Sequence, residues 1–443
     1  MTDRSAAFLE TLDRRVEAIA DACTACGACA TACPTLDVAG IDAGAPEALT
    51  AGVRAILQAG GGPAPSEAWA RVCCGSGHCL TVCPEGINPR FMLTMARRTL
   101  TRQAAAEDRR AAGKAAFQKM SRGVRVLSRL SLPPDLLARL SPRSHPERDE
   151  APDVVFYTGC NLLKTPHIGL LCLDVLERLG ITYEVQGGPG ACCGILQTRP
   201  GDTANAGRQA FTTLDRMAAA KTSQVLSWCP TCQVQFGETM IPSYREVTGK
   251  ALGMTMFPVW LAARLEALRP MMTRPVPRRV ALYEYAGELG VNQAVRALLG
   301  AVPGLELVEI GTRSIGYTSS ALAPLGRYHR DRLAAALRDA EAAGVDTLVG
   351  LYHSDHREFA GHEAHWPFAV ANYMELVGES MGLAAPDRFK ALKAMQDADA
   401  ILTASADQIR AHGLDPEEVR SVILADMLGD QALPADRSRH AAE

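Results

Sequence analysis

One short run of cysteines constrains this chain more than any other feature. Residues 23–34 read Cys-Thr-Ala-Cys-Gly-Ala-Cys-Ala-Thr-Ala-Cys-Pro. Three cysteines spaced three residues apart on a tight turn can direct their thiolates at one small inorganic cluster. The fourth lies too far along the chain to join them. The run therefore predicts a turn wrapped around a cluster, not a disulfide framework.

The run has the C-x2-C-x2-C-x3-C-P spacing of cubane 4Fe–4S sites in bacterial ferredoxins, where the fourth cysteine ligates a neighbouring cluster. A second run, at residues 73–84, reads Cys-Cys-Gly-Ser-Gly-His-Cys-Leu-Thr-Val-Cys-Pro. Together they predict a ferredoxin-like domain with two 4Fe–4S clusters over residues 1–130. Crossed ligation would assign Cys83 to the first cluster and Cys33 to the second. The candidate ligands are Cys23, Cys26, Cys29, Cys33, Cys73, Cys74, Cys79 and Cys83.

The second run departs from the ferredoxin pattern at one position, because Ser76 stands where the second cysteine belongs. Three interpretations stay open. In the first, Cys74 replaces the missing ligand and gives an atypically ligated 4Fe–4S site. In the second, Ser76 ligates through oxygen, although such clusters favour thiolates. In the third, the site holds a 3Fe–4S cluster with three ligands.

The distribution of cysteines points to metal binding. All 14 cysteines lie before residue 233, and only Cys172 falls outside a motif. Such clustering is typical of ligands in a reducing compartment. Residues 1–20 lack the apolar segment of an export signal, and no 18 consecutive residues are apolar. We therefore expect a cytoplasmic protein with no transmembrane segment, attached at most peripherally, through a partner, to the inner face of the membrane.

Charge and motifs exclude other classes. The net charge of −3 gives nucleic-acid binding no electrostatic support. No dinucleotide fingerprint or P-loop is evident, so we expect no nucleotide or flavin on this chain. Residues 89–130 read as a basic helical stretch, which favours a solvated face over a docking surface. Residues 131–152 are polar and proline-rich, and predict a linker.

Residues 153–270 alternate strand and helix patterns. We expect strands over residues 154–158, 181–185 and 224–228, with helices over 168–179 and 203–219. This order implies a parallel sheet with ligands gathered at the carboxyl ends of its strands. The cysteines expected at that edge are Cys160, Cys192, Cys193, Cys229 and Cys232.

The order Cys160, Cys192-Cys193-Gly194, Cys229-x-x-Cys232 resembles the cysteine-rich CCG domain found in the B subunit of heterodisulfide reductase. With a two-cluster module before it, the chain resembles the fused D subunit of that enzyme family. It is also similar to iron–sulfur subunits of glycolate oxidase, lactate utilisation and anaerobic glycerol-3-phosphate dehydrogenase systems. The resemblance implies a non-cubane 4Fe–4S cluster, with all five cysteines as candidate ligands. A zinc site made by a subset of them is the structural alternative.

Residues 277–376 repeat the strand–helix order without cysteines. A shift of 127 residues places Cys160 on Gly287 and the cysteine pair on Ser319-Ser320, and alignment by strand end places the last pair on His353 and His356. The expected fold is therefore mixed α+β and α/β, with a helical ferredoxin-like module and two pseudo-repeated halves. The second half either serves architecture and docking or holds another metal at His353 and His356. Residues 377–443 predict a helical C-terminal tail.

These observations favour an electron-transfer subunit of a multi-subunit oxidoreductase. Electrons would pass between a flavoprotein dehydrogenase partner, or other redox subunits, and a quinone or thiol/disulfide acceptor. A membrane-associated quinone partner would fit, and nucleic acid would not. A catalytic subunit acting on a disulfide or thiol substrate at the CCG cluster is the first alternative. The second is a non-enzymatic metal-binding scaffold.

Overall fold

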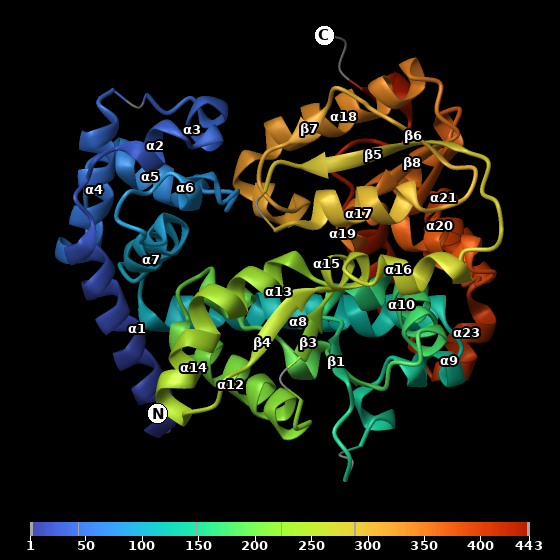
Figure 1. The fold of residues 1–443 in the computed structure, drawn as a ribbon, viewed down its shortest axis with the longest axis horizontal. Coiled ribbons are helices and arrows are strands. Elements are labelled where there is room, and N and C mark those ends of the chain that lie inside the picture. The colour runs from blue at the N-terminus through green and yellow to red at the C-terminus, as the bar shows by residue number, and fades with distance from the viewer. Residues whose placement is uncertain (1–2, 43, 147–148, 223, 288, 441–443) are drawn as a thin grey trace.

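The computed structural model describes residues 3–42, 44–146, 149–222, 224–287 and 289–440. Figure 1 shows a helical N-terminal part beside two α/β halves, one below the other. Each half is built on its own parallel sheet. The expected combination of a helical module and two α/β halves is confirmed.

Helices alone make up the described N-terminal module. Gly27 is the N-cap of the short helix that carries Cys29 and has a positive φ of 78°, and a Cβ there would lie 2.8 Å from the Glu47 backbone nitrogen. The basic stretch is helical, but it is divided into two helices near residue 103. The helices are α1 (Asp3–Ala22), α2 (Ala28–Thr31), α3 (Pro34–Ala39), α4 (Pro46–Ala59), α5 (Ala64–Val72), α6 (His78–Thr81), α7 (Pro89–Thr101) and α8 (Ala106–Ser131).

The first α/β half has four parallel strands in the order β2-β1-β3-β4. Its strands are β1 (Val154–Tyr157), β2 (Tyr183–Gln186), β3 (Gln224–Ser227) and β4 (Gly253–Met256). In the register, Phe156 of the central β1 pairs with Val185 and Leu226. Between and after the strands lie η2 (Asn161–Lys164), α10 (Pro166–Arg178), η3 (Pro189–Ala191), α11 (Ile195–Thr198), α12 (Thr203–Ala219), α13 (Pro230–Val234), the π-helical η4 (Gln235–Met240), α14 (Ile241–Thr248), α15 (Phe257–Ala262), α16 (Leu265–Leu268) and η5 (Arg269–Met271).

The second half repeats this topology, with strand order β6-β5-β8-β9 and a short β7 beside the end of β5. Because both sheets add strands in the same sequence, the expected pseudo-repeat is confirmed. Its strands are β5 (Arg279–Tyr285), β6 (Glu306–Val308), β7 (Arg313–Ser314), β8 (Thr347–Gly350) and β9 (Ala369–Asn372). Its helices are α17 (Val291–Gly300), η6 (Ser319–Leu325), α18 (Gly326–Ala342), α19 (His353–Phe359), η7 (Ala360–His365) and α20 (Tyr373–Ser380).

The remaining helices lie in the two segments expected to be a linker and a tail. The first segment holds α9 (Pro134–Arg139) and η1 (Pro142–Ser144). The second holds α21 (Arg388–Ala394), α22 (Ala398–Ala404), α23 (Ala406–His412), α24 (Pro416–Val422), the π-helical η8 (Ile423–Leu428) and η9 (Arg437–Arg439).

The C-terminal helices pack against the long α8. Val126, Leu127 and Leu130 of α8 form one buried cluster with apolar side chains that include Phe389 and Val419. One face of the basic stretch is therefore covered by the chain itself. No helix in the described part of the chain is both long enough and apolar enough to cross a bilayer.

Candidate iron–sulfur sites

The first cysteine group contains the crossed partner expected from the spacing. Cys23, Cys26, Cys29 and Cys83 line one small space between the two cysteine-rich turns. Burial raises the pKa of Cys29, a hydrogen bond from Thr50 opposes that rise, and the neighbouring Cys23, Cys26 and Cys83 add to it. The fold thus brings Cys83 to the first turn, although 50 or more residues separate it from the other three.

The second group forms around Cys33, which interacts electrostatically with Cys73, Cys74 and Cys79. Burial raises the pKa of Cys73 to about 12, and the neighbouring Arg97 guanidinium opposes this rise. Such buried thiols become thiolates most easily when a cation neutralises them. Four cysteine thiols thus lie close to one another, with a cation beside them, as a cluster site requires.

Neighbouring polar groups hold two sulfur atoms of this second group. The indole N–H of Trp69 donates to Cys33 Sγ at 3.2 Å, and the Thr35 hydroxyl lies 3.1 Å from Cys74 Sγ. Arg97 donates to the carbonyl of Cys73 at 2.9 Å and so fixes the turn from outside. Cys74 and Ser76 are both buried, at 1% and 7% exposure.

The third group gathers the five cysteines of the first α/β half at the carboxyl edge of its sheet. Hydrogen bonds connect their thiols in the order Cys160, Cys192, Cys193, Cys232 and Cys229. Hydrogen bonds from Cys160 and Cys193 lower the pKa of Cys192 well below its ordinary value. The pKa of Cys229 is lowered by Cys232 in the same way.

Two glycines let the loops of this third group approach one another. Gly159 has a positive φ of 68°, and a Cβ there would lie 3.0 Å from Cys229 Cβ. Gly194 has a positive φ of 83°, and a Cβ would lie 2.6 Å from the Ala206 carbonyl oxygen. Positive φ without steric conflict is available to glycine alone at such contacts, which explains the glycine after the cysteine pair.

A cavity of about 370 Å³ separates the five cysteines from the second half. Its far wall carries the serine pair that replaces cysteines in the repeat, and Ser320 Oγ lies 3.1 Å from Thr231 Oγ1, between Cys229 and Cys232. Cationic and imidazole side chains also line the cavity: Arg199, His329, Arg330, His353 and Arg357. Two carboxylates, Glu358 and Asp430, line the cavity as well, so the cysteines face a polar pocket with charges of both signs.

The second and third cysteine groups meet at Tyr317. A Cβ on Gly75 would lie 2.5 Å from the Tyr317 ring, so the ring packs directly on the second cysteine turn. The Tyr317 phenol is hydrogen-bonded to Thr231, and the nearby Cys229 raises the pKa of this phenol. Burial raises the pKa of Tyr317 to about 12. This tyrosine gave no signal in the sequence, because its role depends on contact between domains.

The histidines of the second half divide between different places. His353 lines the cavity facing the five cysteines. His356 lies three residues later on α19 and belongs to a separate buried group with His167, Glu375 and Asp387. His362 packs against the His440 ring, with centroids 5.8 Å apart. Sequence alignment of the two halves predicted His353 and His356 as ligands of one metal. Among the described residues, the group that holds His356 does not include His353.

Comparison with known proteins agrees with this geometry. Residues 15–87 match the family model of a 4Fe-4S dicluster domain, and residues 154–237 match the CCG cysteine-rich domain. The chain is 26% identical over 323 residues to the D subunit of the dihydromethanophenazine:CoB–CoM heterodisulfide reductase of Methanosarcina barkeri (strain Fusaro / DSM 804). That alignment covers 66% of this chain and 75% of the relative.

The fold and the cysteine groups define an iron–sulfur redox protein with a dicluster domain and a CCG domain. Over most of its length it is similar to the D subunit of heterodisulfide reductase, as the order of its motifs indicated. The converging cysteines fit iron–sulfur clusters, because such clusters are held by cysteine thiolates.

Proposed function

We propose that this protein is the electron-transfer subunit of a multi-subunit oxidoreductase. Cys23, Cys26, Cys29 and Cys83 would hold one 4Fe–4S cluster. A second, atypically ligated cluster would be held by Cys33, Cys73, Cys74 and Cys79. The non-cubane cluster would be held by Cys160, Cys192, Cys193, Cys229 and Cys232. Bound clusters would supply one-electron chemistry, with potentials set by burial and by hydrogen bonds to sulfur.

The serial contact of the three cysteine groups carries this proposal. Cys29 of the first group acts electrostatically on Cys79 of the second. Tyr317 then packs between Gly75 of the second turn and Thr231 of the third group. Short steps through buried groups are what a chain that relays electrons requires. The chain's own contribution is to exclude water and to donate hydrogen bonds to sulfur from Trp69 and Thr35.

The partners follow from what the chain lacks and what its relative does. The described sequence shows no nucleotide fingerprint, so a flavoprotein dehydrogenase or another redox subunit would deliver or collect electrons. The relative's name joins a reduced carrier, dihydromethanophenazine, to a disulfide. The relative's name thus supports a thiol/disulfide couple as the acceptor, and a quinone-like carrier is the other acceptor class we propose. A cytoplasmic location, peripheral to the membrane through a partner, would fit this role.

Stopped-flow absorbance of the photoreduced, anaerobically purified full chain tests the relay. Mixing with menadione, as a soluble quinone, should reoxidise all clusters with no change in free thiol content. A variant with Cys193→Ser should keep two reoxidation phases and lose the third. Protein that binds no iron and has no visible absorbance would contradict the proposal and leave the scaffold interpretation.

The three arginines of the cavity, Arg199, Arg330 and Arg357, favour a second candidate function, reduction of an anionic disulfide at the CCG cluster. Arg357 carries this alternative, because its Nε and Nη1 are buried without a hydrogen-bond partner among the described residues. An anionic group in the cavity would supply one. The reaction would break the S–S bond, consuming two electrons and two protons to give two thiols. The absence of cysteines at Ser319 and Ser320 weakens it, because the reductase family uses two such sites on one disulfide.

Reduced methyl viologen as donor and the CoB–CoM heterodisulfide as substrate test this second function. Turnover with a KM raised about tenfold by Arg357→Gln would support it. The matched control is Arg327→Gln, whose side chain is 92% exposed and lies outside the cavity lining. Absence of turnover in a protein that menadione reoxidises would leave electron transfer as the function.

A further inference from the structure

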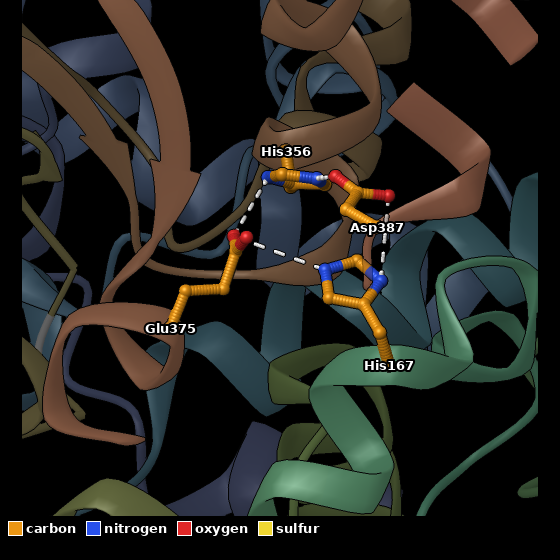
Figure 2. Close-up of side chains that lie close together, drawn as sticks. All are labelled: His167, His356, Glu375 and Asp387. Carbon is orange, nitrogen blue, oxygen red and sulfur yellow. Dashed lines mark hydrogen bonds and ion pairs between the residues drawn. The ribbon is translucent and has the colours of Figure 1, made fainter. Parts of the chain in front are cut away.

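Two buried histidines and two half-buried carboxylates from distant parts of the chain meet between the two α/β halves (Figure 2). His167 comes from α10 of the first half, whereas His356 and Glu375 come from α19 and α20 of the second. Asp387 is the N-cap residue of α21. Each residue offers a ligand atom within 4.8 Å of the other three, although no motif connects them in sequence.

Asp387 orients both imidazole rings. His356 Nε2 lies 2.5 Å from Asp387 Oδ2, and His167 Nδ1 lies 3.5 Å from Asp387 Oδ1. The carboxylate is itself fixed, because Oδ1 accepts the backbone N–H of Lys390 at 3.0 Å. A ring that directs one N–H at a carboxylate presents the lone pair of its other nitrogen on the opposite side. This is the arrangement by which outer carboxylates orient metal-binding histidines.

The opposite nitrogens converge on Glu375. His167 Nε2 and His356 Nδ1 each lie 3.8 Å from Glu375 Oε2, beyond hydrogen-bond distance. Neither nitrogen has a hydrogen-bond partner among the described residues, and the two histidines are 1% and 0% exposed. Glu375 Oε2 is held in place by the Asn372 backbone N–H at 2.6 Å. Two buried lone pairs and a fixed carboxylate oxygen therefore converge on one point.

We propose that this group is a divalent transition-metal site, with His167 Nε2, His356 Nδ1 and the Glu375 carboxylate as ligands and Asp387 as the orienting carboxylate. Nitrogen and oxygen ligands of this kind suit Zn²⁺. With zinc–ligand distances of about 2.0–2.1 Å, neighbouring tetrahedral ligands lie roughly 3.3 Å apart. The observed 3.8 Å needs only a small closure of the rings on the ion.

The site would hold the two walls of the cavity together. His167 follows the Cys160 loop by one short helix, and α19 carries both His356 and the cavity residues His353 and Arg357. A bound ion would thus join the cysteine-bearing half to the half without cysteines. The inference stands apart from electron transfer, because it rests on ligands outside all three cysteine groups.

Zinc binding to the full chain tests the proposal. Anaerobic protein with its iron retained is dialysed against a chelator and given one equivalent of Zn²⁺, and zinc and iron are counted by mass spectrometry. We expect about one zinc per chain at unchanged iron content. Zinc-edge X-ray absorption should show histidine scattering with nitrogen and oxygen at about 2.0–2.1 Å, and no sulfur at about 2.3 Å.

Variants separate this site from adventitious zinc. His167→Asn and Glu375→Gln should abolish the nitrogen/oxygen signal, and Asp387→Asn should weaken zinc affinity about 10–100-fold. The matched control is His362→Gln, which removes another buried histidine from the same half. Zinc that binds through sulfur, or zinc content that the three variants leave unchanged, would overturn the proposal. So would a wild-type chain that binds no zinc.

Discussion

Local spacing predicts the ligand role of most cysteines, whereas the role of Cys74 depends on how the chain packs. Cys73 and Cys79 keep their ferredoxin positions, whereas Ser76 removes the cysteine between them. Cys74 is buried beside Thr35 and acts electrostatically with Cys33, so it is the nearest replacement thiol. We therefore propose Cys74 as the fourth ligand of the second cluster.

The pair Cys74→Ser and Ser76→Ala tests this assignment. If Cys74 is a ligand, Cys74→Ser should reduce the iron content by about one to four atoms per chain and alter one EPR signal. Ser76→Ala should leave both unchanged, because the serine hydroxyl would not ligate. Iron analysis and EPR of the anaerobic proteins distinguish the two. The reverse result would favour ligation through the serine oxygen, and insensitivity to both substitutions would favour a three-ligand cluster.

At the scale of residues, the sequence predicted what local spacing encodes. The three cysteine groups follow from motifs and from the rule that parallel strands gather their carboxyl ends at one edge. The sequence did not predict that Tyr317 packs between two cysteine groups. It also did not predict that His167, Glu375 and Asp387 lie around His356. Those contacts join elements that are distant in the chain, and no periodicity or spacing records which helix will pack on which.

At the scale of elements, polar groups secure the loop after Cys160. Lys164 of η2 pairs with Asp426 of η8 at 3.3 Å, with both side chains less than 10% exposed. Burial, and then the nearby Arg357, lower the pKa of Lys164 to about 8, and Asp426 opposes that fall. The C-terminal helices therefore stabilise the cysteine-bearing half through one buried ion pair.

Removing one partner of this pair should cost more than removing both. Asp426→Asn leaves a buried ammonium without its carboxylate, which should lower the free energy of unfolding by about 3–5 kcal/mol. The double variant Lys164→Met with Asp426→Leu should recover most of that loss, because no buried charge remains. Chemical unfolding followed by circular dichroism measures both. Equal losses in the single and double variants would show that the pair acts through packing alone.

The second half carries a pH-sensitive element in His362. Burial, and then the positive charges of His440 and Lys393, lower the pKa of His362 to about 4. The folded state therefore binds fewer protons than the unfolded state between about pH 4 and 6.5. Stability is full above that range and falls as the pH drops through it.

Acidification should accordingly destabilise the wild type more than His362→Gln. From pH 7.5 to 5.5 the wild type should lose about 1 kcal/mol of unfolding free energy relative to the variant. Unfolding curves at both pH values, from matched buffers, give the difference. A variant that tracks the wild type at both pH values would mean that the pKa of His362 is the same in the folded and unfolded states.

At the scale of the whole molecule, the duplication explains the site. Both halves add strands in the same order, and the repeat shift correctly placed the serine pair opposite the cysteines. Alternation of buried strands with helices made this topology readable from sequence. Short helices were harder: α19 is 7 residues long. A helix of that length carries too few turns to reveal its period.

The helical module lies beside both α/β halves (Figure 1). His78, beside the second cysteine turn, lies 2.8 Å from the Ala286 carbonyl oxygen of the second half. Arg90 joins Glu238 of the first half, with Nε 2.9 Å from the carboxylate. The half without cysteines thus helps to position the second cysteine turn.

Iron and acid-labile sulfide analysis with EPR, on anaerobically purified wild type and Cys193→Ser, tests the central claim of three clusters in series. We predict about 12 irons per chain in the wild type, with about 8 irons and one EPR signal lost in the variant. Cys172→Ala, which changes a buried cysteine outside every group, should retain all of the wild-type iron. About 8 irons in the wild type, with no change on mutation of Cys193, would contradict the account, because the CCG domain would then hold no iron–sulfur cluster.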